Sequence, residues 1–125
     1  MALLKSDVSN PLGTLVATES QGLASSVTQI DDSGGTIYQI EINNSGNQSD
    51  VYLKLYQGSG NTPTVGSTAP DHIIKCLSAS TVSVAYPDGL AYTVALFAAV
   101  VSGSGGTEGT TDPTGTVKYS IRYTT

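Results

Sequence analysis

The side chains best suited to acid–base or nucleophilic chemistry lie in one short segment, Pro-Asp-His-Ile-Ile-Lys-Cys. It contains His72, the only histidine, and Cys76, the only cysteine. On an extended strand these two residues would share a face but lie roughly 13 Å apart, at about 3.3 Å per residue. A cysteine–histidine nucleophile–base pair needs hydrogen-bond contact, which this spacing prevents on one straight strand. The simpler interpretation is a histidine at the start of a strand and a buried cysteine that packs as a small apolar side chain.

A hydrolase triad would add a carboxylate and a serine to the histidine. Asp71 directly precedes His72, but the chain has no G-x-S-x-G turn to mark a nucleophilic serine. Acid–base catalysis also needs a base and its partner within hydrogen-bond reach, and this single histidine is the main candidate for the base. We therefore predict that the protein is not an enzyme.

Metal and phosphate sites have little support. The adjacent carboxylates of Asp31 and Asp32 could hold a surface Ca²⁺, but the alternating oxygen ligands and closing glutamate of a calcium loop are missing. An Asx turn explains these residues more simply. One histidine and one cysteine cannot complete a zinc site, and no G-x-G-x-x-G segment is present to bind phosphate. The sequence predicts no metal and no cofactor.

The charge distribution argues against nucleic acid and membrane partners. The formal net charge is −5. The five cations are scattered along the chain: Lys5, Lys54, Lys75, Lys118 and Arg122. Phosphate binding draws its free energy from grouped cations that release counterions. The longest weakly polar run, residues 91–101, is too short to span a bilayer, and the first residues, MALLKSDVSNPLG, do not resemble a secretory signal.

Alternation of apolar and polar residues with a period of two recurs along the chain, which predicts an all-β protein. Expected strands cover residues 14–18, 26–30, 36–43, 50–57, 71–77, 80–86, 91–101 and 116–124. About eight short strands at this spacing are typical of an antiparallel β-sandwich or jelly roll. We expect residues 1–12 to form an extended N-terminal arm and residues 13–125 to form a single sandwich domain.

The connections suggest how the strands pair. The Asn/Gly/Ser-rich loop between residues 36–43 and 50–57 favours an antiparallel pair of these two strands. The long connection that follows contains glycines and prolines, and we expect it to cross between the sheets. Only a two- or three-residue turn separates strands 71–77 and 80–86, and Pro87-Asp88-Gly89 is expected to end the second of them.

Two of the expected strands carry large side chains on both faces. In residues 50–57, Tyr52 and Tyr56 lie opposite the core-facing aliphatic residues. Residues 91–101 are apolar on both faces, with Phe97 and Val101 on the second one. Other parts of the chain could cover these second faces, or the faces could form a subunit interface. The candidate interface residues are Tyr52, Tyr56, Phe97 and Val101, together with Leu3 and Leu4 of the arm.

The order of segments in the middle of the chain resembles that of a known group of proteins. VYLKLYQG (51–58) is followed by TPTVGSTAPDHIIKCLSAS (62–80), VAYPDGLAYTVALFAAV (84–100) and a loop that ends GTTDP (109–113). This order resembles small β-sandwich virion proteins of tailed bacteriophages, which have a YLKLY strand, a PTVGTTAP crossover, a P-x-GLA turn and a Gly/Thr/Asp-rich final loop. The resemblance covers about half the chain.

The resemblance implies a non-enzymatic virion component such as a capsid decoration (cement) protein. Such a protein would be made in the host cytoplasm, bind the major capsid protein on the capsid exterior and stabilise the shell. From the usual symmetry of oligomers we expect self-association as a homotrimer. The alternative is a tail or head-fibre component that binds a receptor or a glycan through Tyr92 or the loop 102–115.

Overall fold

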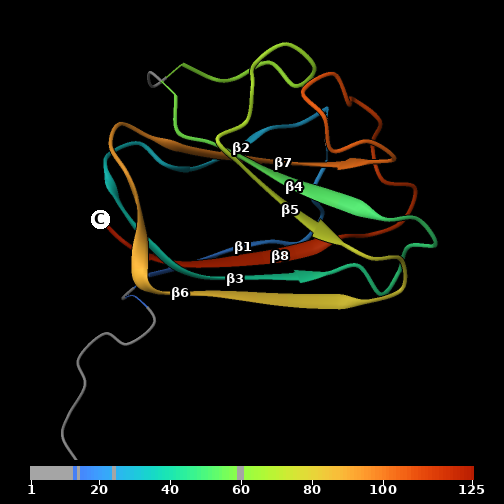
Figure 1. The fold of residues 1–125 in the computed structure, drawn as a ribbon, viewed down its shortest axis with the longest axis horizontal. Coiled ribbons are helices and arrows are strands. Elements are labelled where there is room, and N and C mark those ends of the chain that lie inside the picture. The colour runs from blue at the N-terminus through green and yellow to red at the C-terminus, as the bar shows by residue number, and fades with distance from the viewer. Residues whose placement is uncertain (1–12, 14, 24, 59–60) are drawn as a thin grey trace, which may run out of the picture.

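The computed structural model describes residues 13, 15–23, 25–58 and 61–125. Regular structure in this part of the chain consists of eight strands (Figure 1). They are β1 (Leu15–Glu19), β2 (Thr28–Asp31), β3 (Gly35–Asn43), β4 (Val51–Tyr56), β5 (His72–Cys76), β6 (Thr81–Tyr92), β7 (Leu96–Ser102) and β8 (Lys118–Thr124). The expected N-terminal arm, residues 1–12, lies outside the described residues.

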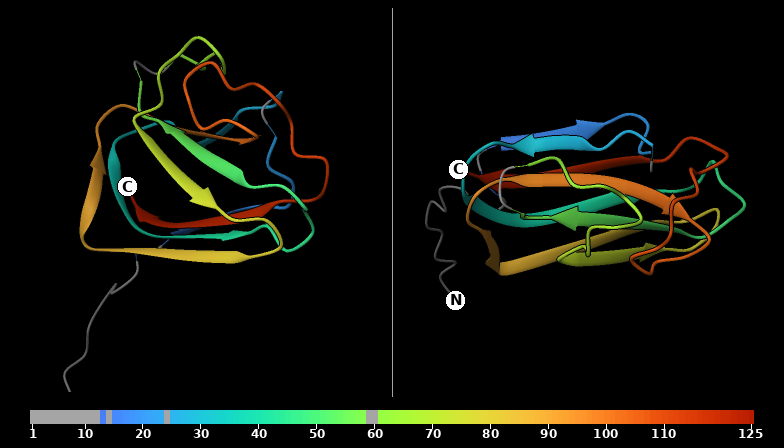
Figure 2. Two further views of the ribbon diagram at one scale, coloured as in Figure 1. Left: turned by 45° about the vertical axis from the view of Figure 1, so that its right-hand side comes forward. Right: turned by 90° about the horizontal axis from the view of Figure 1, so that it is seen from above.

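The strands form two antiparallel four-stranded sheets that pack face to face (Figure 2). Sheet A has the strand order β1-β8-β3-β6, and sheet B has the order β2-β7-β4-β5. The predicted fold class, an all-β antiparallel sandwich, is confirmed.

The main core lies between the two sheets and comes from the residues that the alternation predicts to face inward. In sheet A, Ile40 pairs with Ile121; in sheet B, Leu53 pairs with Val100. Each of these four side chains is fully buried. Burying such aliphatic side chains contributes about 1.5–3 kcal/mol each, so this layer is the main source of stability.

The predicted pairing of residues 36–43 with 50–57 is wrong. β3 pairs with β6 and β8, whereas β4 pairs with β5 and β7. Each strand has a core-facing side, and alternation determines which residues face inward but not which strand lies alongside. The loop between β3 and β4 therefore carries the chain from one sheet to the other.

The next two connections are also the reverse of the expectation. Residues 57–71 do not cross between sheets, because β4 and β5 are neighbours in sheet B. The short turn after β5 makes the crossing instead, since β6 belongs to sheet A. A hydrogen bond from the backbone N–H of Ala79 to the carbonyl of Asn47 ties this turn to the β3–β4 loop.

β6 continues through the Pro87-Asp88-Gly89 segment that was expected to end it. Its pairing with β3 slips there, because Ile37 pairs with Leu90 and Gln39 pairs with Ala85. The extra residues form a bulge in which Gly89 has a φ of +82°, a conformation that suits glycine. As a result β6 extends to Tyr92, and the single strand predicted over residues 91–101 is split between the two sheets.

Candidate functional site

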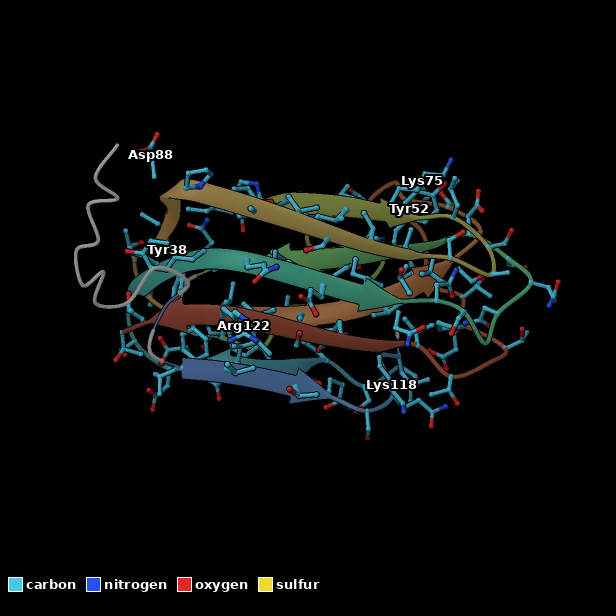
Figure 3. All side chains as sticks on the ribbon, turned by 90° about the horizontal axis from the view of Figure 1, so that it is seen from below. Tyr38, Tyr52, Lys75, Asp88, Lys118 and Arg122 are labelled. Atoms are coloured by element: carbon cyan, nitrogen blue, oxygen red, sulfur yellow. The ribbon has the colours of Figure 1, made fainter. Side chains whose placement is uncertain are left out.

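The two outer faces of the sandwich differ. The outer face of sheet A lies open, and no described segment crosses it (Figure 3). Polar residues of neighbouring strands pair across it, including Glu41 with Ser83 and with Ser120. Lys118 and Arg122 also lie on this face (Figure 3). A polar outer face of this kind is the ordinary solvated side of an antiparallel sheet.

The outer face of sheet B, in contrast, is largely buried. Its cross-strand pairs are Tyr52 with Val101, Lys54 with Ala99, and Tyr56 with Phe97. Tyr56, Phe97 and Val101 are only 1%, 2% and 0% exposed. These three side chains are therefore buried within the chain itself, and not on the surface where the sequence suggested a subunit interface.

Two loops of the chain itself cover this face, above β4 and β7 in Figure 1. The loop of residues 57–71 brings Val65 against the cluster that contains Tyr56 and Phe97. The loop of residues 103–117 brings Gly105 so close to Tyr52 that a Cβ there would lie 2.6 Å from the ring. The second apolar face is thus a second, smaller core, which is covered by loops and not by strands.

The placement of the Lys54 side chain is the least expected from its sequence position. It is 0% exposed, and its Nζ donates hydrogen bonds to the carbonyls of Gly106 (2.7 Å) and Gly109 (3.0 Å). Burial lowers the pKa of Lys54, and the charge of Glu108 partly opposes that effect. The ammonium group therefore serves to hold the 103–117 loop over sheet B. Its position in an alternating strand gave no sign of this role.

Tyr52 is partly exposed to solvent, and it lies next to exposed apolar side chains along the edge strand β5. Lys75 pairs with Tyr52 across the sheet, and its Nζ lies 5.8 Å from the centre of the Tyr52 ring. On either side of Lys75, Ile73 is 45% exposed and Leu77 is 58% exposed. We call Tyr52, Ile73 and Leu77 the β5-edge patch. Leu3 and Leu4, the other candidate interface residues, lie outside the described residues.

His72 and Cys76 occupy opposite ends of β5. They pair with Leu55 and Val51, so the two residues share one face of the strand, as predicted, and this face is the inward one. The Cys76 thiol is buried and donates to the carbonyl of Ser80 at 3.5 Å. Burial raises its pKa, which disfavours the thiolate that a nucleophile requires.

The carboxylates of Asp71 and Asp31 both accept hydrogen bonds from groups of the chain itself. Asp71 Oδ2 accepts a hydrogen bond from the backbone N–H of Gln57 at 2.7 Å, which joins the end of β4 to the start of β5. Asp31 Oδ1 accepts from the backbone N–H of Ser33, as the predicted Asx turn requires. Asp31 Oδ2 accepts from the hydroxyl of Tyr92 at 2.7 Å. Tyr92, the candidate glycan contact, is itself buried in the main core.

Two buried asparagines hold the end of the sandwich where the chain crosses between sheets. Asn44 Nδ2 donates to the carbonyls of Ser49 and Leu77. Asn47 Nδ2 donates to Asn44 Oδ1, and Asn47 Oδ1 accepts from the backbone N–H of Gly115 at 2.5 Å. In the sequence these residues indicated only a turn, because the long-range partners of an amide cannot be found from local spacing.

Within the described ranges, no three His, Cys, Asp or Glu side chains gather as a metal-binding group would, and no helix there is long and apolar enough to cross a bilayer. Comparison with protein-family models, with curated proteins and with solved structures finds no match to this chain.

Proposed function

We propose that this protein is a non-enzymatic structural component of a tailed-bacteriophage particle, most specifically a capsid decoration protein on the outer surface of the shell. The proposal rests first on the resemblance described above. Its segments correspond to β4, β5, β6, β7 and the two loops that cover sheet B. Two of the signatures that carry the resemblance, the YLKLY strand and the crossover that follows it, supply Tyr56 and Val65 to the second core.

The observation that carries the proposal is that the polar groups most suited to chemistry bind other parts of the chain instead. Lys54, Asp31 and Asp71 each bind a backbone or side-chain group that holds a loop or a strand end, and Cys76 is a protonated, buried thiol. A protein whose ionisable groups serve its own architecture is suited to act through its surface. Contact with a partner is therefore the function that this sandwich supports best.

The mechanism would be mass action. A protein that binds the assembled shell but not its free subunits stabilises the shell by its binding free energy, repeated at every site. Residues 1–12, which include Leu3 and Leu4, are proposed to contact the major capsid protein. The β5-edge patch replaces Tyr56, Phe97 and Val101 as the proposed contact between copies in a homotrimer, because its Ile73 and Leu77 are exposed and apolar and β5 is an edge strand of sheet B.

The test measures binding to particles of the encoding phage from which this protein has been removed. The full chain should bind to saturation at sites repeated over the capsid, seen by electron microscopy. Deleting residues 2–12 should lower occupancy about tenfold or more at equal protein concentration, while the circular dichroism of the sandwich stays unchanged. Binding confined to the tail, or no binding by the full chain, would contradict the capsid role.

Self-association is tested separately by light scattering of the isolated protein. The full chain should have the mass of a trimer, and the double variant Ile73→Asp/Leu77→Asp should have the mass of a monomer. Val94→Asp is the control, because Val94 is as exposed as Ile73 but lies in the turn between β6 and β7 and is not part of the β5-edge patch. A monomeric full chain would rule out the β5-edge patch as a trimer contact.

A further inference from the structure

The edges of the two sheets differ in how readily they would accept a further strand. In the described part of the chain, the edge strands are β1 and β6 in sheet A and β2 and β5 in sheet B. The backbone groups on the outer side of an edge strand can pair with a strand from another chain. Proteins prevent such pairing with prolines, bulges or very short edge strands.

β6 and β2 carry this kind of protection. β6 contains Pro87 and the bulge around Gly89. β2 has only four residues, and its pairing shifts between Gln29 and Asp31. A proline lacks the N–H that a neighbouring strand would need, and a bulge interrupts the regular spacing of the backbone groups. Neither strand therefore offers a regular edge to a second chain.

β1 and β5 have regular edges. Each has five residues in unbroken register with its neighbour, and neither contains a proline. Each also carries exposed apolar side chains. On β1, Leu15 is 41% exposed and Val16 is 51% exposed, and Ile73 and Leu77 give the β5-edge patch a similar character. These two edges are therefore the ones best suited to accept a further strand.

The charges on these two strands do little to guard them. Lys75 is the lysine of β5, and its Nζ lies 3.5 Å from Asp50 Oδ2, which offsets part of its charge. On β1 the charged residue is Glu19, at the last position of the strand. A single charge on each strand does not repel a second strand as a row of lysines would.

The two regular edges lie on opposite sides of the sandwich. Figure 3 shows β1, in blue, on one side and Lys75 of β5 on the other, and the right-hand view of Figure 2 shows the same separation. In sheet A, strands β8, β3 and β6 lie between β1 and the side where β5 is found. The β1 and β5 edges of one copy therefore cannot meet each other.

We propose that β1 of one copy pairs with β5 of the next copy, so that the copies join head to tail in a closed ring. This inference rests on the homotrimer proposed above, and it names the surface that the β5-edge patch contacts. A ring of three copies needs a contact between two different surfaces, because a patch that contacts its own copy joins subunits only in pairs. The β1–β5 contact provides this and uses both regular edges of every copy.

The alternative contacts leave an edge uncovered or build an open assembly. Pairing of β5 with β5 would make a dimer in which both β1 edges stay exposed. Adding a β1–β1 contact to that dimer would extend it into a fibre without a natural end. The head-to-tail contact avoids both results, because the ring has neither edge exposed.

The first test measures the mass of the isolated full chain and of two variants by analytical ultracentrifugation at about 50 µM. Ile73→Asp/Leu77→Asp alters the β5 edge, and Leu15→Asp/Val16→Asp alters the β1 edge, since a carboxylate is costly to bury in a contact. The full chain should be a trimer, and each variant alone should be a monomer. Circular dichroism checks that both variants keep the sandwich fold.

Mixing the two variants tests the head-to-tail arrangement directly. Each variant supplies the edge that the other lacks, so an equimolar mixture should form a heterodimer with one contact, and the ring cannot close. The mixture is measured at about 0.5 mM, because a single contact lacks the added stability of ring closure. If copies instead met through identical patches, the mixture would stay monomeric.

Cross-linking keeps the test decisive if the aspartate variants do not fold. Val16→Cys and Ile73→Cys each place a thiol at an exposed position, whereas the native Cys76 is buried. A bismaleimide that spans about 10 Å, roughly two strand spacings, should join the two variants when they are co-expressed. Neither variant should cross-link when expressed alone. Val94→Cys co-expressed with Ile73→Cys is the control and should give no product, although Val94 is as exposed as Ile73.

The inference is overturned if the full chain is a monomer or a dimer, or if a folded Leu15→Asp/Val16→Asp variant remains a trimer. It is also overturned if the mixed variants stay monomeric or if Ile73→Cys cross-links to itself. Binding to phage particles tests the capsid role separately. A monomer that saturates the capsid would refute this contact alone, whereas a trimer that binds no particle would refute the capsid role alone.

Discussion

At the residue scale, a few polar side chains fasten segments that are distant in sequence. Lys54 reaches the loop more than fifty residues further along the chain, and Asn47 reaches Gly115. Tyr92, at the end of β6 in sheet A, donates its hydroxyl hydrogen to Asp31, at the end of β2 in sheet B. Each of these hydrogen bonds replaces hydrogen bonds to water in the unfolded chain, so its net contribution to stability is modest. Its main effect is to fix the position of the segment that it holds.

The Tyr92–Asp31 bond gives a first prediction. Tyr92→Phe removes a hydrogen bond to a carboxylate, and such bonds contribute about 1.5–3 kcal/mol. We expect the free energy of unfolding in urea to fall by about 2 kcal/mol at neutral pH. Tyr38→Phe is the control, since Tyr38 is only partly buried and its hydroxyl makes no hydrogen bond between the sheets within the described residues; it should change stability by less than about 0.5 kcal/mol. Equal effects of the two substitutions would show that the inter-sheet bond adds nothing.

At the element scale, the bulge in β6 lets one strand turn while it stays paired with β3. The bulge needs a left-handed residue at Gly89, and it also brings that residue close to Thr36, where an added Cβ would lie 2.3 Å from Cγ2. Gly103 has a similar φ of +86°, but nothing lies within 4 Å of its Cβ position. A side chain at Gly103 would therefore meet backbone strain alone, whereas a side chain at Gly89 would meet both backbone strain and a steric clash.

Alanine substitutions at these glycines form a matched pair. Gly103→Ala should lower the free energy of unfolding by about 1 kcal/mol, the cost of a left-handed alanine. Gly89→Ala should lower it by about 3 kcal/mol, because overpacking adds to the same backbone cost. Thermal or urea unfolding of both variants provides the measurement. If Gly89→Ala costs no more than Gly103→Ala, Thr36 moves aside and the bulge is looser than described.

The same bulge shows what the sequence could and could not predict. The alternation alone predicts the strands that contain Ile40, Leu53 and Ile121, and it predicts that these side chains face the core. Both assignments are confirmed. Pro87-Asp88-Gly89 has the composition of a turn, and only pairing with β3 on both sides makes it a bulge. Strand partners, the loop cover of sheet B and the roles of Lys54 and Asn47 depend on contacts between distant segments, which local patterns do not encode.

At the scale of the whole molecule, buried tyrosines make stability depend on alkaline pH. Burial raises the pKa of Tyr56, Tyr86 and Tyr92 above the ordinary value, and raises that of Tyr119 to about 12. The folded state therefore holds these protons more tightly than the unfolded state. Their contribution is fully present below pH 10 and is lost as the pH rises through the folded pKa values.

We therefore expect the free energy of unfolding to fall steadily between about pH 10 and pH 12, by about 3 kcal/mol from Tyr119 alone. Lys54 acts with the opposite sign, because its pKa is lowered in the folded state: it makes stability rise with pH until the unfolded lysine has lost its proton. Because one lysine opposes four tyrosines, the free energy of unfolding falls overall as the pH rises. Urea unfolding at a series of alkaline pH values measures it, and Tyr119→Phe should flatten the decline. A constant unfolding free energy up to pH 12 would contradict the prediction.

The strand order of sheet A also constrains when the protein can fold in the cell. β8 lies between β1 and β3, so the last of the eight strands to leave the ribosome is an interior member of its sheet. Until it is made, β1 has no neighbour in that sheet, and Asn47 lacks the Gly115 amide that it binds. Such long-range closure favours slow folding that begins only after synthesis of this domain is nearly finished. A ribosome stalled before residue 118 should therefore carry a nascent chain that proteases cut readily.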